Sequence, residues 1–164
     1  MKMKEIIPPV PFEAIKSELT ENKFIRKTNK AGNRIYVINA SNAPNTMREI
    51  GRLRELSFRN AGGGTGLECD LDEFDTGENY YQQLIVWDPD EEAILGGYRF
   101  FICDSGNYFK EGEIRLATAK LFNFSDKFIK NYLPHMIELG RSFVQPRYQS
   151  TAMKRKGIYA LDNL

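Results

Sequence analysis

The chain has 164 residues, of which 41% are hydrophobic and 27% are charged. These values are typical of one globular domain that is long enough to bury its own core without disulfides or metals. No apolar run approaches the roughly 20 residues that a membrane-spanning helix needs, and the start of the chain has no signal-peptide pattern. The single histidine, His135, excludes a multi-histidine metal site.

Charge is unevenly distributed along the chain, although its net value is only +1. Residues 1–66 carry 12 Lys/Arg and 6 Asp/Glu, residues 67–113 carry 2 and 13, and residues 114–164 carry 9 and 3. Either the fold brings these segments together and neutralises them, or it offers a basic face to an acidic partner. Nucleic acid is a poor candidate for that partner, because the sequence has no glycine–aromatic RNA motif and no basic recognition helix.

The first predicted elements are a helix over 11–19 and two strands over 24–27 and 34–39, joined by a turn at 30–33. A longer helix follows, because apolar residues recur at helical spacing at Met47, Ile50, Leu53 and Leu56. Thr46 and Glu49 predict a capping box at its start, and residues 60–64 end it.

The remaining elements are a hairpin over 80–88 and 93–103, a polar excursion to about residue 124, a short helix from Ser125 to Leu133, and a strand over 136–144. Helical character resumes near Gly157. This order predicts an α+β fold with a mostly antiparallel central sheet flanked by helices.

The strand over 136–144 places charges where a buried strand is normally apolar. Alternation divides it into two faces, with Ile137, Leu139, Arg141 and Phe143 on one and Glu138, Gly140 and Ser142 on the other. An unpaired charge on an apolar face is costly, so Arg141 requires a carboxylate partner.

Arg99 presents the same problem in the strand over 93–103, where it shares a face with Leu95, Phe101 and Cys103. We expect one network that joins two arginines and three acids, namely Arg99, Arg141, Asp72, Asp75 and Glu138. Such a network either locks the fold or prepares an active site, because perturbed carboxylates in clefts are the usual general bases.

Two further segments have the glycines or the positive charge that phosphate groups attract. The GGGTG run at 62–66 is interpreted as a flexible linker, because it lacks the GK[ST] ending and follows a helix. Lys154, Arg155, Lys156 and Gly157 enter a predicted helix and suit a phosphate, the alternative being a solvated basic turn. Cys69 and Cys103 are expected to be reduced thiols, with a disulfide as the alternative, and His135 a structural or surface residue.

Several motifs then converge on one superfamily. They are Leu53-Arg54 with Phe58, Asp72-Glu73-Phe74-Asp75, Leu95-Gly96-Gly97-Tyr98-Arg99-Phe100, and Glu138-Leu139-Gly140-Arg141-Ser142-Phe143-Val144. This succession, over residues 48–149, resembles the acyl-carrier-protein-dependent N-acyltransferases. These include the acyl-homoserine-lactone synthases and, more closely, the ornithine-lipid and glycine-lipid N-acyltransferases, some of which carry a haemolysin label.

The resemblance implies the fold of the Gcn5-related N-acetyltransferases (GNAT) and an enzyme of aminolipid synthesis. This enzyme would move a fatty acyl group from acyl carrier protein, or from acyl-CoA, to the amino group of an amino acid, with no permanently bound cofactor and no metal. It also implies a bacterial, cytoplasmic protein, with peripheral contact to the inner membrane as an option. Only 24 residues follow Gly140. The single domain over 1–164 is therefore expected to lack its C-terminal part and to be the N-terminal portion of a longer protein.

Carried over residue by residue, the resemblance implies catalytic positions at Asp72, Asp75, Arg99, Glu138 and Arg141. Glu138 would take a proton from the attacking ammonium. A strand N–H next to Gly140 would polarise the thioester carbonyl, and the donor would be bound by Gly140, Ser142, Lys154, Arg155, Lys156 and Gly157. Arg54 and Arg59 would contact the acidic carrier protein. The alternatives are a non-catalytic module that binds carrier protein or lipid, and a small-molecule acetyltransferase that uses acetyl-CoA.

Overall fold

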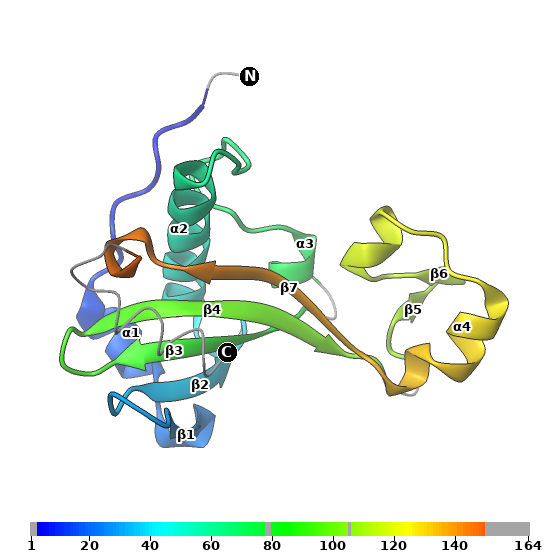
Figure 1. The fold of residues 1–164 in the computed structure, drawn as a ribbon, viewed down its shortest axis with the longest axis horizontal. Helices are drawn as coiled ribbons and strands as arrows, with labels where there is room; N and C mark the ends of the chain where they lie inside the picture. Colours follow the sequence, from blue (N-terminus) through cyan, green and yellow to red (C-terminus); the bar gives the residue numbers. More distant parts are fainter. Residues whose placement is uncertain (1–2, 78–79, 105, 150–164) are drawn as a thin grey trace.

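The structure is a computed structural model that describes residues 3–77, 80–104 and 106–149. Its centre is an antiparallel five-stranded sheet in the order β1-β2-β3-β4-β7 (Figure 1). The strands are β1 (Phe24–Lys27), β2 (Arg34–Ile38), β3 (Gln82–Asp88), β4 (Ala93–Ile102) and β7 (Ile137–Val144). This arrangement confirms the predicted α+β class with a mostly antiparallel sheet.

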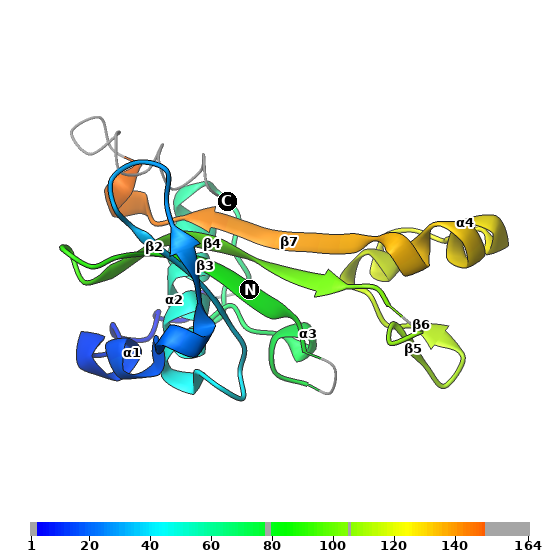
Figure 2. The same cartoon turned by 90° about the horizontal axis from the view of Figure 1, so that it is seen from below.

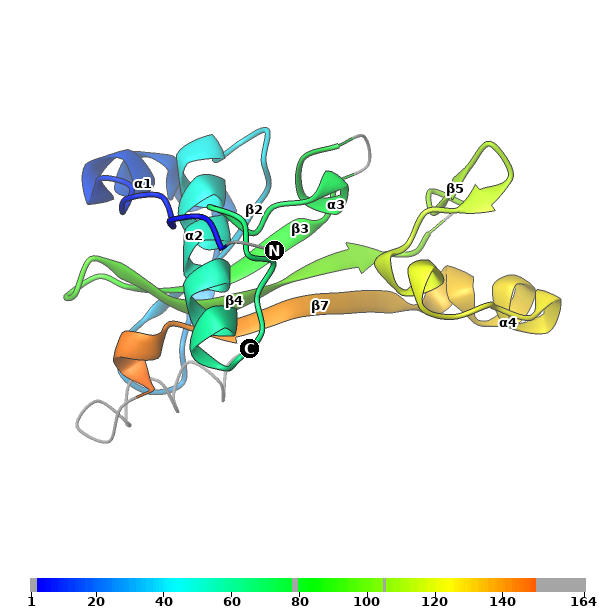
Figure 3. The ribbon, with the colours of Figure 1, turned by 90° about the horizontal axis from the view of Figure 1, so that it is seen from above.

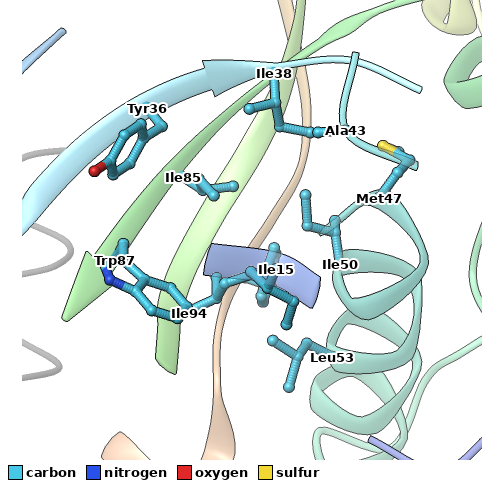
Figure 4. Close-up of a cluster of buried hydrophobic side chains, with 11 residues drawn as sticks. Ile15, Tyr36, Ile38, Ala43, Met47, Ile50, Leu53, Ile85, Trp87 and Ile94 are labelled. Atoms are coloured by element: carbon cyan, nitrogen blue, oxygen red, sulfur yellow. The ribbon is translucent and has the colours of Figure 1, made fainter. Parts of the chain in front are cut away.

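Three helices, α1 (Phe12–Glu18), α2 (Pro44–Asn60) and α3 (Glu73–Thr76), lie over one face of the sheet (Figure 3). The apolar residues of α1 and α2 meet the sheet in the main core, where Ile15, Ile50 and Leu53 pack against Ile85 and Trp87 (Figure 4). On the opposite face, a 3₁₀ turn, η4 (Pro146–Tyr148), inserts the fully buried Tyr148 against a smaller cluster made by Ile35, Val86 and Leu95. None of the helices in the described part of the chain is long and apolar enough to cross a membrane.

Residues 103–136 form a separate lobe beyond the far ends of β4 and β7 (Figure 2). The lobe contains β5 (Phe109–Lys110), β6 (Glu113–Ile114), η2 (Ala117–Lys120), α4 (Asp126–Asn131) and η3 (Leu133–His135), while η1 (Glu21–Lys23) lies in the main body. The lobe has its own small core, which joins Tyr108, Leu116 and Leu133 to the end of the sheet through Tyr81 and Phe101. Ser125 caps α4 as predicted, since its Oγ accepts a hydrogen bond from Phe128 N at 3.3 Å.

The start of α2 differs from the predicted capping box. The helix begins at Pro44, and Thr46 and Glu49 do not bond to each other's backbone. Instead Glu18, at the end of α1, accepts hydrogen bonds from the N–H groups of Asn45 (2.9 Å) and Thr46 (2.7 Å). Burial would raise the pKa of Glu18, but these hydrogen bonds outweigh it and lower that pKa, which keeps a negative charge at the helix N-terminus.

Replacing Glu18 by alanine should lower the free energy of unfolding by about 1 kcal/mol, because two N–H groups at the start of α2 lose their acceptor. Chemical denaturation monitored by circular dichroism measures this change. Glu13→Ala is the matched control, since Glu13 is an exposed acid on the same helix and should change stability by less than about 0.5 kcal/mol. Equal effects of the two substitutions would show that Glu18 does not cap α2.

A β-bulge in β7 changes the predicted facing of its residues. Gly97 pairs with Phe143 and Arg99 pairs with Gly140, so Arg141 and Ser142 both lie opposite Tyr98. Arg141 adopts a left-handed backbone with φ +54°, which is strained for a residue with a side chain. The prediction that Arg141 shares a face with Ile137 and Leu139 is therefore wrong. The bulge turns its side chain to the helix-covered face of the sheet, toward Asp70 and Asp72, and Glu138 lies on this same face of β7.

A second irregularity explains why Leu95 does not share the face of Arg99. The pairing of β3 with β4 shifts between Val86 and Trp87, so Ile94 enters the main core and Leu95 the opposite cluster. The glycines that follow allow close strand contact. A Cβ on Gly96 would lie 2.5 Å from Phe143 O, and one on Gly97 would lie 2.5 Å from Leu84 O. Side chains there would push β7 and β3 away from β4.

Candidate active site

A buried ion-pair network connects α2, α3 and β4 at the centre of the sheet. Arg54 and Asp75 have no exposed side-chain surface, and both oxygens of Asp75 accept hydrogen bonds from Arg54 Nη1 at 3.0 Å. Arg99 Nη1 donates to Asp72 Oδ1 at 2.7 Å and to Asp75 Oδ2 at 3.2 Å. Gln83 completes the cluster by accepting from Arg54 Nη2 at 2.6 Å and donating to Asp75 Oδ1 at 3.1 Å.

Arg141 extends this network to β7. Its guanidinium lies 3.3 Å from Asp70 Oδ2 and 3.6 Å from Asp72 Oδ2. Three arginines therefore face three aspartates, so the cluster is electrically balanced. The sequence predicted Arg99, Arg141, Asp72 and Asp75 as one network, and the structure brings these four together.

The acids of the network titrate in different directions. Burial raises the pKa of Asp70 more than Arg141 and Arg54 lower it. Burial would also raise the pKa of Asp72, but the hydrogen bond and charge of Arg99 hold that pKa below its usual value. Asp70 Oδ2 and Arg99 Nε are both buried without a hydrogen-bond partner among the described residues. Such perturbed and under-satisfied groups are more common at functional sites than in ordinary cores.

Glu138 stands apart from the arginines and binds the lobe. Its Oε1 accepts from Thr118 N at 2.7 Å, and its Oε2 accepts from Ala117 N at 3.2 Å and from the Tyr81 hydroxyl. The Tyr81 ring in turn lies under Arg99, whose guanidinium carbon is 5.2 Å from the ring centroid. Burial and the hydrogen bond to Glu138 both raise the pKa of Tyr81, so the phenol remains a proton donor to the carboxylate. Glu138 therefore contacts the network only through Tyr81, which the sequence did not suggest.

An apolar groove of about 270 Å³ lies between the lobe and the start of β7, and Glu138 is part of its wall. The wall is otherwise mostly apolar and comes from Cys103, Leu116, Thr118, Phe122, Phe124, Phe128, Leu133, Met136, Ile137 and Leu139. A carboxylate beside an apolar groove of this kind is the arrangement expected of a binding site with a positioned acid–base group.

Both residues that were assigned to partner binding make contacts within the chain. Arg54 is fully buried and cannot touch a partner, because α3 covers it with Asp75. Arg59 is used inside the chain, where it donates to Glu55 Oε1 at 2.7 Å and to the carbonyls of Lys4 and Leu67. Glu55 also accepts from Thr65 N at 2.9 Å, so the glycine-rich loop is anchored to α2 rather than being the flexible linker that was predicted.

The other predicted positions are placed as follows. Gly140 is half-buried next to Arg99, and Ser142 is exposed on the bulge. Lys154, Arg155, Lys156 and Gly157 lie outside the described residues. Cys69 and Cys103 are separate free thiols, so the alternative of a disulfide is wrong. Asp70 and Tyr81 were not proposed from the sequence, and only the density of acids between residues 68 and 75 pointed toward Asp70.

Comparison with known proteins gives the site a family context. The chain is 59% identical, over 162 residues, to a protein named glycine N(alpha)-acyltransferase from Bacteroides thetaiotaomicron, a match that covers 99% of this chain and 48% of the relative. A protein of the same name from Phocaeicola vulgatus is 56% identical, with 99% and 50% covered. The chain thus spans about half the length of these curated relatives. No solved structure matches it.

A family model described as an acetyltransferase (GNAT) domain matches residues 53–156. This range includes every residue of the network, the whole wall of the groove and the strands β3, β4 and β7, whereas β1 and β2 precede it. The chain belongs to the GNAT acetyltransferase domain family.

Proposed function

We propose that this chain carries the acid–base centre of an N-acyltransferase that moves a fatty acyl group from a carrier-protein thioester to the amino group of an amino acid. The observation that carries the proposal is the position of Glu138, which joins the apolar groove to the buried charge network. The names of the two relatives, glycine N(alpha)-acyltransferase, support an amino-acid acceptor.

Glu138 has the chemistry of a general base. A carboxylate has about four lone-pair sites, and three of those on Glu138 are used by the Tyr81 hydroxyl and the N–H groups of Ala117 and Thr118. The remaining site, on Oε1, is available for a proton from the attacking ammonium, directly or through water. The three fixed donors hold the carboxylate in one orientation, which suits a base that must meet its substrate repeatedly in the same geometry.

The backbone of β7 offers a donor for the thioester oxygen. Cys103 N donates to Met136 O at 2.9 Å, and Arg99 pairs with Gly140. By the alternation of an antiparallel ladder, the N–H groups of Glu138 and Gly140 point toward β4, and that of Leu139 points to the outer edge of the described sheet. We assign the polarising donor to this outward N–H beside Gly140, where negative charge develops as the amine attacks.

The groove favours a long acyl chain over an acetyl group. Its wall is almost entirely apolar and aromatic, and burying each methylene of a chain there contributes about 0.8 kcal/mol. An acetyl group would leave most of this surface unused. We therefore rank a fatty acyl donor above acetyl-CoA, and place the enzyme in aminolipid synthesis on the cytoplasmic side of the inner membrane.

The proposal is tested by incubating the chain with palmitoyl-loaded acyl carrier protein and glycine, and detecting N-palmitoylglycine by mass spectrometry. The relative from Bacteroides thetaiotaomicron is the positive control, and palmitoyl-CoA and acetyl-CoA are the alternative donors. We expect product from the carrier-protein thioester. Saturable binding of the loaded carrier protein without any product would favour the non-catalytic module, and product from acetyl-CoA alone would favour the small-molecule acetyltransferase.

A further inference from the structure

The lobe and the adjoining end of β7 expose an unusual amount of apolar surface. Besides Phe109 on β5, six large side chains, Leu121, Phe122, Tyr132, Met136, Ile137 and Leu139, are between 41% and 76% exposed. We call these six residues the docking face. Monomeric proteins rarely expose contiguous apolar patches larger than a few hundred Å², and such patches generally mark interaction sites.

The docking face surrounds the opening of the groove. Phe122, Met136, Ile137 and Leu139 belong to its wall as well as to the exposed surface. Tyr132 lies next to this wall, because its ring stacks on that of the wall residue Phe128, with 6.0 Å between the ring centroids. A molecule that leaves the groove therefore emerges onto an apolar surface.

Positive charge accompanies the docking face. Residues 114–136 carry Arg115, Lys127 and Lys130, together with Lys120, which is paired with Glu73, but only one acid, Asp126. Residues 104–113 carry three acids and one lysine, and Figures 2 and 3 show that this β5–β6 hairpin diverges from α4 while α4 continues the line of β7. Three of the four acids between residues 104 and 136 thus lie on the hairpin, and only Asp126 is on α4.

We propose that the docking face binds the surface of an anionic lipid bilayer and opens the groove directly onto it. Large apolar side chains flanked by lysines and an interfacial tyrosine are the combination that lies in the headgroup region of membranes. Anionic headgroups attract the flanking cations, and the apolar side chains enter the acyl boundary. The bilayer matches both features at once, because its anionic headgroups lie directly above a continuous apolar layer that Leu121 and Phe122 can enter.

The inference extends the proposed function, because an N-acylated product is itself a lipid that needs a membrane to enter. It is tested by flotation of the whole chain with vesicles of phosphatidylcholine alone, or of phosphatidylcholine in which about one lipid in three is phosphatidylglycerol. The anionic lipid gives the second kind of vesicle a negative surface potential. No acyl donor or acceptor is added, so vesicle binding and acyl transfer fail independently. We expect binding to the anionic vesicles that weakens as salt screens the charges.

Two double variants separate the contributions. Leu121→Ser with Tyr132→Ser should weaken vesicle binding at least tenfold, and Lys127→Gln with Lys130→Gln should weaken it about fivefold for each lysine, on anionic vesicles only. The matched control is Ile25→Ser with Lys27→Gln on β1, which removes an exposed apolar residue and an exposed lysine far from the lobe. Thermal unfolding followed by circular dichroism checks that each variant is folded.

Several results would overturn the proposal. One is an absence of flotation with anionic vesicles at low salt, and another is equal binding by the lobe variants and the β1 control. A third is a soluble partner, seen as binding of acyl carrier protein that the Leu121 and Tyr132 substitutions abolish while flotation is unchanged. A fourth is a dimer in sedimentation velocity that the same substitutions dissociate without affecting flotation, since the face would then join two copies of the chain.

Discussion

Replacing Glu138 by glutamine should lower the rate of acyl transfer by roughly 10²- to 10⁴-fold while leaving the fold intact. The amide has nearly the shape of the carboxylate and its single oxygen still accepts from Thr118 N, but its NH2 group cannot accept from Ala117 N, and the amide cannot take the proton of the ammonium. The measurement is the steady-state rate of N-palmitoylglycine formation, with the melting temperature recorded in parallel.

Glu113→Gln is the matched control, because Glu113 is an exposed acid of the same lobe and should leave the rate unchanged. Tyr81→Phe adds a graded test. It removes one of the three hydrogen bonds that orient Glu138, so the rate should fall less than in Glu138→Gln and its pH profile should shift. Full activity of Glu138→Gln would remove this residue from the role of base, whatever its contacts.

Replacing Asp75 by alanine should lower the free energy of unfolding by about 3–5 kcal/mol, the largest loss that we expect from a single substitution. Its carboxylate accepts hydrogen bonds from Arg54, Arg99, Gln83 and the N–H of Asp72, and no part of it reaches solvent. Without it, Arg54 is a fully buried charge with no acid in hydrogen-bonding contact. Urea denaturation measures the loss.

Two comparisons show whether the cause is the buried charge. Glu73 is next to the network on the same short helix, but its ion pair with Lys120 is exposed, so Glu73→Ala should cost less than about 1 kcal/mol. The double substitution Arg54→Met with Asp75→Leu removes both members of the buried pair and leaves Arg99 with Asp72. It should be more stable than Asp75→Ala alone, and a loss as large as in the single variant would indicate that packing, not charge, dominates.

Much of the fold follows from local patterns that the sequence displays directly. The hairpin of β3 and β4 and the helix α2 have long, regular alternation or helical spacing, and both were predicted with nearly correct bounds. The start of α2 was misjudged because Glu18, which caps it, lies 26 residues before Pro44. A helix cap can be recognised in a sequence only when the capping residue is close to the start of the helix.

The sequence predicted part of the charge network and missed the part that depends on tertiary contacts. A charge within a strand pattern must be paired, which identified Arg99 and Arg141, and the nearest acid-rich segment supplied Asp72 and Asp75. The burial of Arg54 was not predicted, because an arginine on a helix normally faces solvent. Arg54 is buried only because α3 packs over it in the folded chain. The face on which Arg141 lies was predicted wrongly, because the bulge cannot be recognised in the sequence. The residue with the left-handed backbone is an arginine and not the glycine that usually marks such a position.

Because of the bulge in β7, residues an odd number of positions apart on either side of it lie on the same face of the strand. Glu138 and Arg141 are three residues apart and would lie back to back in a regular strand, yet the extra residue brings them to the same side. The placement of both side chains on one face of β7 therefore depends on this extra residue. A deletion of one residue here would reverse the phase of the strand and place Arg141 on the face opposite to Glu138, the proposed base, even if every chemical group were retained.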